Sequence, residues 1–439
     1  MKGIRTNRVV SAIAIACALG IARATGGTVV RVERAGKGFQ LTRDGKPYFI
    51  KGAGGCDSEF LMNELAAAGG NSIRIWSARE ESKGQFDMAH AHGLTVCPTL
   101  WMGRDNNTPD NKGGDYGDEK RVLGLIEKAR SSVLFFKDHP ALLAWGVGNE
   151  MESPGSGSPE LWKTVDGIAA MIHEVDPNHP TLTVIADLGK GGEKVKRIMQ
   201  FCPHLDILGV NSYGGAVTLA ERLEATGWGK PYIVTEFGAN YLNLKKTAWG
   251  AKIEPTTTQR AAKLPRIYDA SIAPGHSHCL GSYVFVWKQP SAFPGFHDCF
   301  MPSGERLGHV DAMTLAWTGK ARKNRCPEME PIVCDASGKD VAPGSPLTAR
   351  VSAKDPDGDR LKTHWEVRAE TTSAKKNKPS FENLASSGSA VESGGVFAIA
   401  FKAPLQPGAY RLFVTIADGA GNAACANVPF HVGGGERGE

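Results

Sequence analysis

Short apolar runs alternate with helix-length amphipathic stretches from residue 28 to about residue 317. Runs of about four to eight residues rich in Val, Ile, Leu and aromatic residues indicate buried strands, whereas apolar residues three and four positions apart indicate helices. Repeated strand–helix units predict a parallel sheet, and eight of them in this length favour a closed (β/α)8 barrel. The strands are predicted at residues 48–52, 72–76, 94–101, 142–148, 182–185, 207–210, 232–235 and 282–287.

Helices are expected between the strands, and a hairpin is expected before the first one. Helices are predicted between most strands, for example at residues 59–68, 121–136 and 161–174. Residues 29–34 and 39–48 read as a hairpin with Asp44-Gly45 as its turn signal. We expect this hairpin to cover the bottom of the barrel, and the predicted barrel domain spans residues 28–318.

The pattern changes after Trp317. Residues 319–331 are basic and contain Pro, as linkers often do. Beyond them, apolar and polar residues alternate with period two at 347–352, 361–367, 396–401 and 410–416, and turn-forming clusters separate these runs. This predicts a small immunoglobulin-like β-sandwich over residues 332–432, followed by a disordered tail at 433–439.

The N-terminus has the pattern of a targeting segment. Lys2, Arg5 and Arg8 precede an apolar stretch at residues 9–21, and Ala22 and Ala24 form a small-x-small cleavage site. This predicts a secretory signal peptide at residues 1–24 and a secreted or periplasmic protein. A lipoprotein signal with Cys17 as the modified residue is the alternative, which the alanine at position 14 disfavours.

Charge and cysteine content narrow the function classes. The net charge of the chain is +5, and the predicted signal carries four basic residues and no acidic one, so the mature chain is near +1. Such a balance argues against nucleic acid or an anionic membrane as a partner, and no later segment resembles a membrane span. Eight of the nine cysteines lie beyond the signal, and an even number in an exported protein predicts disulfides, with the connectivity left open. Cys97 and Cys202 read alternatively as small buried residues, and this is favoured for Cys97.

Two glutamates carry the clearest chemical signal. Glu150 follows the apolar run 142–148, and Glu236 follows the run 232–235. A carboxylate at the end of a buried strand costs free energy unless it is paired with another group or takes part in chemistry. Two of them on two strands of one barrel suggest a pair of carboxyl groups that face a shared substrate. Glycoside hydrolysis needs such a pair, because one group protonates the leaving oxygen while the other attacks or activates water.

Other polar and aromatic residues fall at the same ends of the predicted strands. In a parallel barrel the active site lies at the C-terminal ends of the strands. No Gly-x-Gly-x-x-Gly motif opens a helix after a strand, so no dinucleotide site and no cofactor are expected. The candidate site residues are Arg74, Trp76, Trp101, Asn149, Glu150, Asn211, Tyr213, Glu236 and Trp287.

Several of these residues lie in segments that resemble a known group of enzymes. Gly148-Asn149-Glu150 and Thr235-Glu236 with the following Phe-Gly resemble the acid/base and nucleophile motifs of glycoside hydrolase clan A. Residues 45–52 are similar to the entry into the barrel of glycoside hydrolase family 2. Residues 207–213 resemble that family too and, more distantly, the family 72 glucanosyltransferases. The resemblance covers most of residues 38–318.

The resemblance implies a retaining mechanism with two glutamates in different protonation states. Glu236 would attack the anomeric carbon, and Glu150 would protonate the leaving oxygen and then deprotonate the incoming water or sugar. Arg74, at the position of the clan's strand-two arginine, would keep Glu236 ionised. Tyr213 would donate a hydrogen bond to the same carboxylate.

The resemblance also implies contacts with the sugar. Asn149 would hold the 2-hydroxyl group, and Trp287 would form the floor of the subsite by stacking on the apolar face of the sugar. Trp76 and Trp101 have no clear family position. They would line neighbouring subsites or pack in the core beneath the rim. Asn211 and Tyr213 follow the sixth predicted strand.

Weaker signals are interpreted as structural. The His-containing segments 90–92 and 276–279 lack a four-ligand spacing, so no metal site is expected there. Residues 355–359 alternate Asp with other residues, which fits a calcium loop but more often a polar turn. Trp365 is expected in the sandwich core. Residues 105–116 form a long polar loop at the rim and a candidate subsite wall or lid.

The leading hypothesis is a retaining glycosidase that acts on a β-linked polysaccharide, with a β-glucan as the expected substrate. The alternatives are a β-glucanosyltransferase that uses the same residues and a non-catalytic carbohydrate-binding protein. The sandwich would dock the protein to a surface or act as a spacer. The sugar, the linkage, endo or exo action and the oligomeric state are left open.

Overall fold

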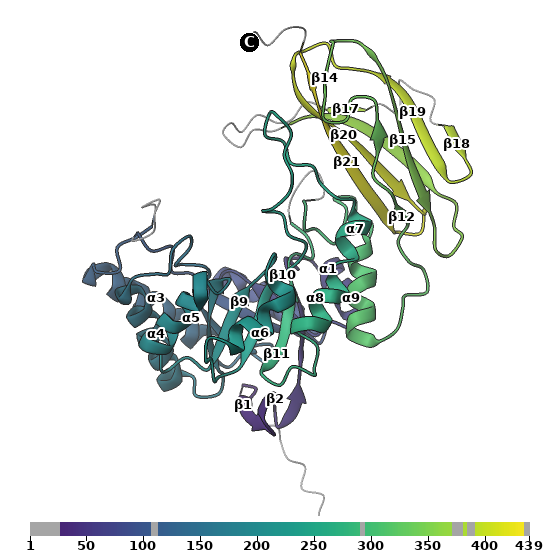
Figure 1. Cartoon of the computed structure of the whole chain (residues 1–439). Helices are drawn as coiled ribbons and strands as arrows, with labels where there is room; N and C mark the ends of the chain where they lie inside the picture. Colours follow the sequence, from purple (N-terminus) through teal and green to yellow (C-terminus); the bar gives the residue numbers. More distant parts are fainter. Residues whose placement is uncertain (1–26, 107–112, 290–294, 371–380, 384–390, 434–439) are drawn as a thin grey trace, which may run out of the picture.

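The computed structural model describes residues 27–106, 113–289, 295–370, 381–383 and 391–433. A closed barrel is followed by two facing sheets (Figure 1). The predicted signal segment with Cys17 lies outside the described residues, as do residues 107–112 of the polar rim loop and residues 434–439 of the tail. No helix in the described part has the length and apolar character needed to cross a membrane.

The predicted (β/α)8 barrel is confirmed. Eight parallel strands close in the order β10-β11-β4-β5-β6-β7-β8-β9. Each strand begins and ends within three residues of its predicted position, because fully buried runs are read directly from the sequence. The strands are β4 (Ile50–Gly54), β5 (Ser72–Ile75), β6 (Thr95–Leu100), β7 (Trp145–Val147), β8 (Thr181–Ala186), β9 (Ile207–Asn211), β10 (Tyr232–Phe237) and β11 (Cys279–Val284).

Helices cover the outside of the barrel, and α4 shows why they form. The Ser158 hydroxyl accepts a hydrogen bond from the Leu161 N–H at 3.1 Å and caps the helix, and Pro159 occupies its first turn. The α-helices are α1 (Glu59–Ala67), α2 (Lys83–Ala91), α3 (Glu119–Phe136), α4 (Pro159–Val175), α5 (Glu193–Phe201), α6 (Leu219–Glu224), α7 (Thr257–Ala261), α8 (Leu264–Ser271) and α9 (Gly308–Thr318). Short 3-10 turns are η1 (Glu80–Ser82), η2 (Lys190–Gly192) and η3 (Ala216–Thr218).

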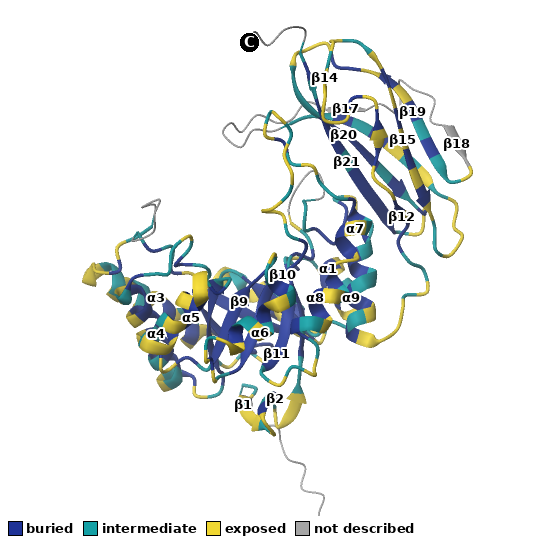
Figure 2. Ribbon diagram, in the orientation of Figure 1, coloured by how far each residue is buried: buried dark blue, intermediate teal, exposed yellow. Residues whose placement is uncertain are grey.

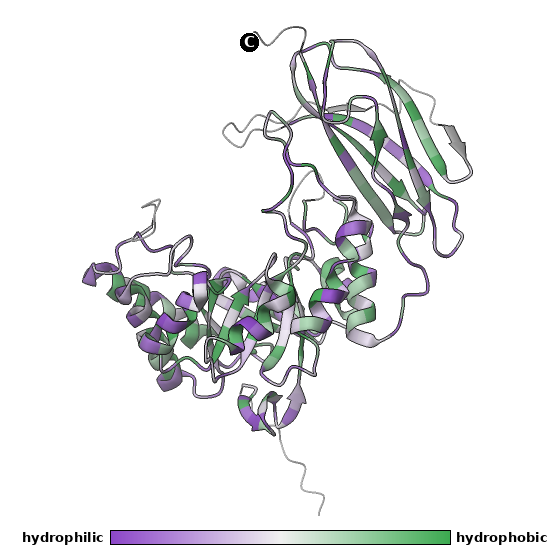
Figure 3. Ribbon diagram, viewed as in Figure 1, coloured by the Kyte–Doolittle hydropathy of each residue, from purple (hydrophilic) through white to green (hydrophobic). Residues whose placement is uncertain are grey.

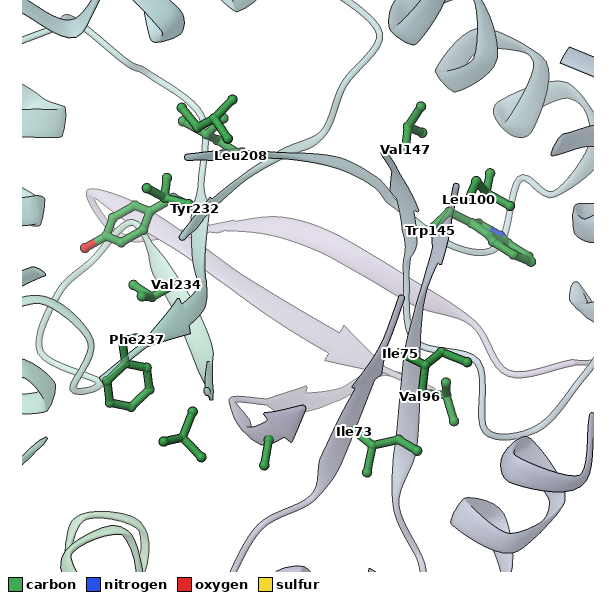
Figure 4. Packing of buried hydrophobic residues seen from close by; sticks show 14 of the residues in the cluster. Ile73, Ile75, Val96, Leu100, Trp145, Val147, Leu208, Tyr232, Val234 and Phe237 are labelled. Carbon is green, nitrogen blue, oxygen red and sulfur yellow. The ribbon is translucent and has the colours of Figure 1, made fainter. Parts of the chain in front are cut away.

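The barrel is held by two apolar layers. One lies between the strands and the helices, and Figure 4 shows part of it, including Ile73, Trp145 and Val234. The other fills the lower barrel around Ile50 and Tyr283. The strands are buried along their length while the outer helix faces are exposed and hydrophilic (Figures 2 and 3). This rigid body fixes the positions of side chains at the strand ends.

A small antiparallel sheet covers the bottom of the barrel, as predicted. Its strands are β1 (Val30–Ala35), β2 (Gly38–Arg43) and β3 (Lys46–Tyr48). Asp44 and Gly45 have φ of 51° and 73°, as a tight hairpin turn requires, and they join β2 to β3. The predicted single hairpin is therefore two hairpins in series, because a second turn at Gly36 joins β1 to β2.

The C-terminal part forms the predicted β-sandwich. One sheet has the order β12-β15-β19-β18 with β13 beside β15, and the other has the order β14-β21-β20-β16-β17. Trp365 is 1% exposed in the shared core, as expected. The strands are β12 (Glu328–Met329), β13 (Val333–Cys334), β14 (Asp340–Val341), β15 (Pro346–Lys354), β16 (Lys362–Ala369), β17 (Phe381–Asn383), β18 (Val391–Ser393), β19 (Val396–Lys402), β20 (Gly408–Ala417) and β21 (Ala423–Val432).

The sandwich lies against the barrel beside α7 and contacts the long β10–α7 connection (Figure 1). Arg411 on β20 is buried and donates to the Lys252 carbonyl at 3.0 Å in that connection. Its guanidinium also forms two hydrogen bonds to Glu370, at 2.9 and 2.6 Å. One buried cation therefore links both domains.

Replacing Arg411 with Ala should destabilise the protein by about 3 kcal/mol, because it leaves the Glu370 carboxylate without its partner. Urea unfolding followed by circular dichroism measures this loss. Arg350→Ala, an exposed position on β15, is the matched control and should change the stability by less than about 0.5 kcal/mol. Equal losses in the two variants would contradict the role given to Arg411.

The predicted disulfides are wrong for this structure. The eight cysteines within the described residues are free and buried. Cys56, Cys97 and Cys299 are at most 2% exposed in the barrel, where burial raises the pKa of each thiol. They pack as small apolar side chains, which was the favoured interpretation for Cys97.

Candidate active site

Four neighbouring or facing strands bring polar side chains to the C-terminal end of the barrel. Arg74 lies on β5, Asn149 and Glu150 directly follow β7, and Asn211 and Glu236 lie near the ends of β9 and β10. The parallel register pairs Glu236 with Asn211 across β10 and β9. These side chains form one continuous hydrogen-bonded network, as the sequence predicts for residues at strand ends.

The Glu236 carboxylate receives hydrogen bonds from three side chains. Arg74 Nη1 donates to Oε1 at 2.7 Å, and Trp76 Nε1 donates to the same oxygen at 3.2 Å. Tyr213 Oη donates to Oε2 at 2.8 Å. Burial, and then the negative charge of Glu236, raise the pKa of Tyr213, so its hydroxyl keeps the proton that it donates. The bond from the Arg74 guanidinium is charge-assisted, and bonds of this kind are shorter and stronger than those between neutral groups.

Glu150 has a different environment. Its Oε1 accepts one hydrogen bond, from Asn211 Nδ2 at 2.8 Å. Burial raises the pKa of Glu150, and the nearby charges of Glu236 and Glu152 raise it further, while the Asn211 hydrogen bond lowers it. Its backbone has φ of 48°, a conformation that residues other than Gly rarely adopt and that often marks functional sites. Glu150 is therefore placed to hold a proton.

Asn149 connects the two glutamates. Its Oδ1 accepts hydrogen bonds from Arg74 Nη2 at 2.6 Å and from Asn211 Nδ2 at 3.2 Å. Thr235 Oγ1 in turn donates to Asn211 Oδ1 at 2.7 Å and fixes the orientation of that amide. Because both contacts use the Asn149 carbonyl oxygen, its amide NH2 group is left to donate to a ligand.

Aromatic rings surround the Glu236 side of the site. Phe285, one residue beyond β11, packs edge-on against Trp76 and Tyr213 with centroid distances of 6.0 and 5.9 Å. Gly54 on β4 makes room for Trp76, because an added Cβ would lie 2.6 Å from the ring. Phe285 is partly exposed and lies beside this network at the C-terminal end of β11.

Trp287 does not line the site, which corrects its predicted role as the subsite floor. It is fully buried, its Nε1 donates to the Leu61 carbonyl at 3.2 Å, and its ring stacks on Trp317 at 6.0 Å. β11 ends at Val284; the Trp287 N–H bonds to the Gly54 carbonyl at 2.8 Å, and its side chain packs in the core beneath the rim. The sequence prediction extended the strand three residues too far.

His297 is a site residue that the sequence did not reveal. Its ring lies 5.0 Å from Tyr213 and 5.6 Å from Phe285, and an added Cβ on Gly238 would lie 2.9 Å from its Nδ1. Burial, and then the positive charge of Arg260, lower the pKa of His297 to about 4, so the ring is neutral at pH 7. No motif or periodicity surrounds this residue, so only the fold identifies it.

The remaining candidates lie apart from this network. Trp101, just after β6, is 55% exposed at the same end of the barrel.

Within the described residues, the group of side chains whose spacing would suit a metal ion is Asp355, Asp359 and Asp418 in the sandwich, with ligand oxygens within 4.8 Å of one another. The predicted polar turn at residues 355–359 is confirmed, because Asp355 Oδ1 accepts hydrogen bonds from the Asp357 and Asp359 N–H groups at 2.8 and 3.1 Å. The calcium loop stays a prediction.

Replacing Glu150 with Gln should raise the midpoint of thermal unfolding at neutral pH. The pKa of Glu150 is raised in the folded protein. Its contribution to stability is therefore fully present below the pKa that it has in the unfolded chain, and is lost as the pH rises through its pKa in the folded protein. Gln removes this loss and still accepts the Asn211 hydrogen bond. Calorimetry should therefore show a gain at pH 7 that vanishes below about pH 4. A variant less stable than the wild type at pH 7 would contradict the raised pKa.

Comparisons with known proteins identify related folds. No family model and no curated protein matches the chain. A β-D-glucuronidase from Dictyoglomus thermophilum matches with a TM-score of 0.50 and 18% identity over 67% of this chain and 54% of its own. An FMN-binding β-glucuronidase from Faecalibacterium prausnitzii matches with a TM-score of 0.50 and 13% identity over 92% of this chain and 59% of its own.

These likenesses concern the fold. The chain spans 54% and 59% of the length of these two enzymes, and identities of 18% and 13% establish a shared architecture rather than a shared activity. The second match covers 92% of this chain, so it extends over the barrel and most of the sandwich. The resemblance to family 72 stays a prediction.

Proposed function

We propose that the protein is a retaining glycoside hydrolase for β-linked sugars, with Glu236 as nucleophile and Glu150 as acid/base. The observation that carries this proposal is the contrast between the two carboxyl groups. Glu236 accepts hydrogen bonds from Arg74, Trp76 and Tyr213, whereas Glu150 accepts one from Asn211 and has a raised pKa. A nucleophile must be ionised and a general acid protonated, so environments that differ in this way support the two proposed roles.

The first step would form a covalent glycosyl-enzyme. A Glu236 oxygen attacks the anomeric carbon while the bond to the leaving oxygen breaks, and Glu150 transfers its proton to that oxygen. In the second step Glu150, now ionised, accepts a proton from water, whose oxygen attacks the same carbon and releases Glu236. Two displacements at one carbon retain its configuration.

The surrounding side chains would position these reactants. Arg74 holds both Glu236 and Asn149, so one guanidinium fixes the nucleophile relative to the amide that would bind the sugar 2-hydroxyl. Hydrogen bonds to that hydroxyl strengthen in the transition state. Phe285 takes the place that the sequence gave to Trp287 and would pack against the cleaved sugar.

The substrate is proposed to be a β-glucan or a related β-linked polysaccharide. The two matched structures with a shared fold are β-glucuronidases by name, so a terminal uronic acid is the competing substrate class for this chain. A neutral His297 beside Tyr213 supplies a hydrogen-bonding group without a positive charge, which suits an uncharged sugar better.

Product release from a panel of substrates tests the proposal. The panel contains β-1,3-, β-1,4- and β-1,6-linked glucans, galactans and mannans, together with aryl β-glucuronide and aryl β-glucoside. We expect cleavage of one neutral linkage, and rising acceptor concentration separates hydrolysis from transfer to a sugar. Cleavage of the glucuronide alone would overturn the neutral substrate, and binding of saccharides without turnover of any substrate would overturn the enzymatic function.

A further inference from the structure

A groove beside the proposed catalytic centre has no role in the chemistry described above. Its volume is about 630 Å³, within the range of about 300–1,000 Å³ typical of ligand sites. Its walls are residues 77–81 after β5, residues 100–103 after β6, and one face of α3. It therefore lies over the C-terminal ends of two barrel strands, where barrel enzymes bind substrates.

The groove is adjacent to residues that contact the nucleophile. Ser77 lines it, and the preceding residue, Trp76, donates a hydrogen bond to Glu236 at 3.2 Å. On the other side, Leu100 ends β6, which pairs with β7, the strand that Glu150 follows. The groove thus begins one residue after Trp76 and one strand before the strand that Glu150 follows.

Both walls are fastened to the scaffold. Ser132 on α3 donates to the Ala78 carbonyl at 2.6 Å. The segment that carries Trp101 is held by Tyr116, whose hydroxyl donates to the Met102 carbonyl at 3.1 Å, and by Arg121, which donates to the same carbonyl at 3.2 Å. Trp101 is nevertheless 55% exposed and lines the groove. A large ring that is exposed on an anchored backbone is pre-organised to stack on a ligand.

The charges that line the groove balance. Three basic side chains face three acidic ones, so neither an anionic nor a cationic ligand is favoured overall. The basic side chains can donate hydrogen bonds to the hydroxyl groups of a sugar, and the acidic ones can accept hydrogen bonds from them, around the aromatic surface of Trp101. The charged residues are Arg79, Arg121, Lys128, Glu80, Glu81 and Glu127.

We infer that this groove is an accessory subsite for neutral sugar units that continue the substrate chain beyond the unit held by Glu150 and Glu236. This inference rests on the proposed function and deepens it. It assigns the enzyme a preference for oligosaccharides and polysaccharides over glycosides of a single sugar, with Trp101 as the stacking platform.

Substrate length is the variable that tests this subsite. The kcat/KM is measured on oligosaccharides of two and of six units, with the sugar and linkage that the wild type cleaves in the panel, for the wild type, Trp101→Ala, Trp101→Phe and Phe135→Ala. Phe135 is an exposed aromatic residue on α3 outside the groove and is the matched control. Trp101→Ala should lower kcat/KM on the six-unit substrate about tenfold more than on the two-unit substrate, mainly through KM. Trp101→Phe should recover part of this difference, and Phe135→Ala should show none.

The outcomes separate the two proposals. If the wild type cleaves these sugars and Trp101→Ala affects both lengths equally or neither, the subsite is refuted while the catalytic function stands. If the wild type turns over no substrate of the panel, the proposed function fails and the subsite falls with it. Titration of the same oligosaccharides into Glu236→Gln, followed by calorimetry, should show tighter binding of six units than of two, and equal affinities would also refute the subsite.

Discussion

Glu236→Ala should reduce the rate of glycoside cleavage by about 10⁴-fold or more, because the variant lacks the atom that would attack the anomeric carbon. The fold should persist, since the partners of this carboxylate, Arg74, Trp76 and Tyr213, are fixed by other contacts or by the barrel strands. Initial rates on the substrate identified in the panel measure the loss. Added azide should enter the vacated space and yield a glycosyl azide of inverted configuration.

Glu224→Ala provides the control for this variant. Glu224 is an exposed carboxylate at the end of α6, and its removal should leave the rate within about twofold of the wild type. A Glu236→Ala protein that is folded and as active as Glu224→Ala would show that another group is the nucleophile. The strand-end assignment of the site would then need to be redrawn.

Glu150→Gln should lower kcat by about 10²- to 10⁴-fold on substrates with poor leaving groups, because amides neither donate nor accept the catalytic proton. The effect on the first step should shrink for aryl glycosides, whose leaving oxygen needs little protonation. Glu150 must be protonated in the first step, so wild-type activity should fall as the pH rises through its pKa. Because that pKa is raised, this alkaline limb should lie above the usual range of a glutamate.

The pH profile distinguishes an acid/base from a residue that only maintains the structure. In Glu150→Gln the alkaline limb should disappear, while azide should increase turnover and yield a product of retained configuration. An unchanged alkaline limb in the variant would assign that limb, and the role of general acid, to a different group. Thermal unfolding at neutral pH, where this variant should gain stability, shows that a loss of activity is not a loss of fold.

Much of the catalytic network could be predicted because it depends on strand ends. Buried strands are recognised from their apolar composition, and parallel pairing then places their C-terminal residues on one rim. The hydrogen bonds from Arg74 and Tyr213 to Glu236 were expected on this basis together with the family resemblance, and both are present. Asn211 lies opposite Glu236 in the register of β9 and β10, and its side chain donates to Glu150.

The errors arise where local sequence does not determine three-dimensional position. An aromatic run at residues 282–287 does not reveal where the strand ends, so Trp287 was placed at the rim although Phe285 lies there. His297 approaches the site through a connection after the last strand, which no periodicity describes. Cysteine number alone does not show whether thiols are paired, and the eight cysteines within the described residues are free and buried.

The central claim is that Glu236 forms a covalent bond to the sugar during turnover. The most direct measurement uses the 2-deoxy-2-fluoro-β-glycosyl fluoride of the sugar that the wild type cleaves, which slows release of the intermediate. Mass spectrometry of the digested protein should then find one glycosyl group, attached to the peptide at Glu236, and inactivation should match its formation. Attachment at a different residue, or turnover by direct displacement with an inverted product and no adduct, would contradict the account.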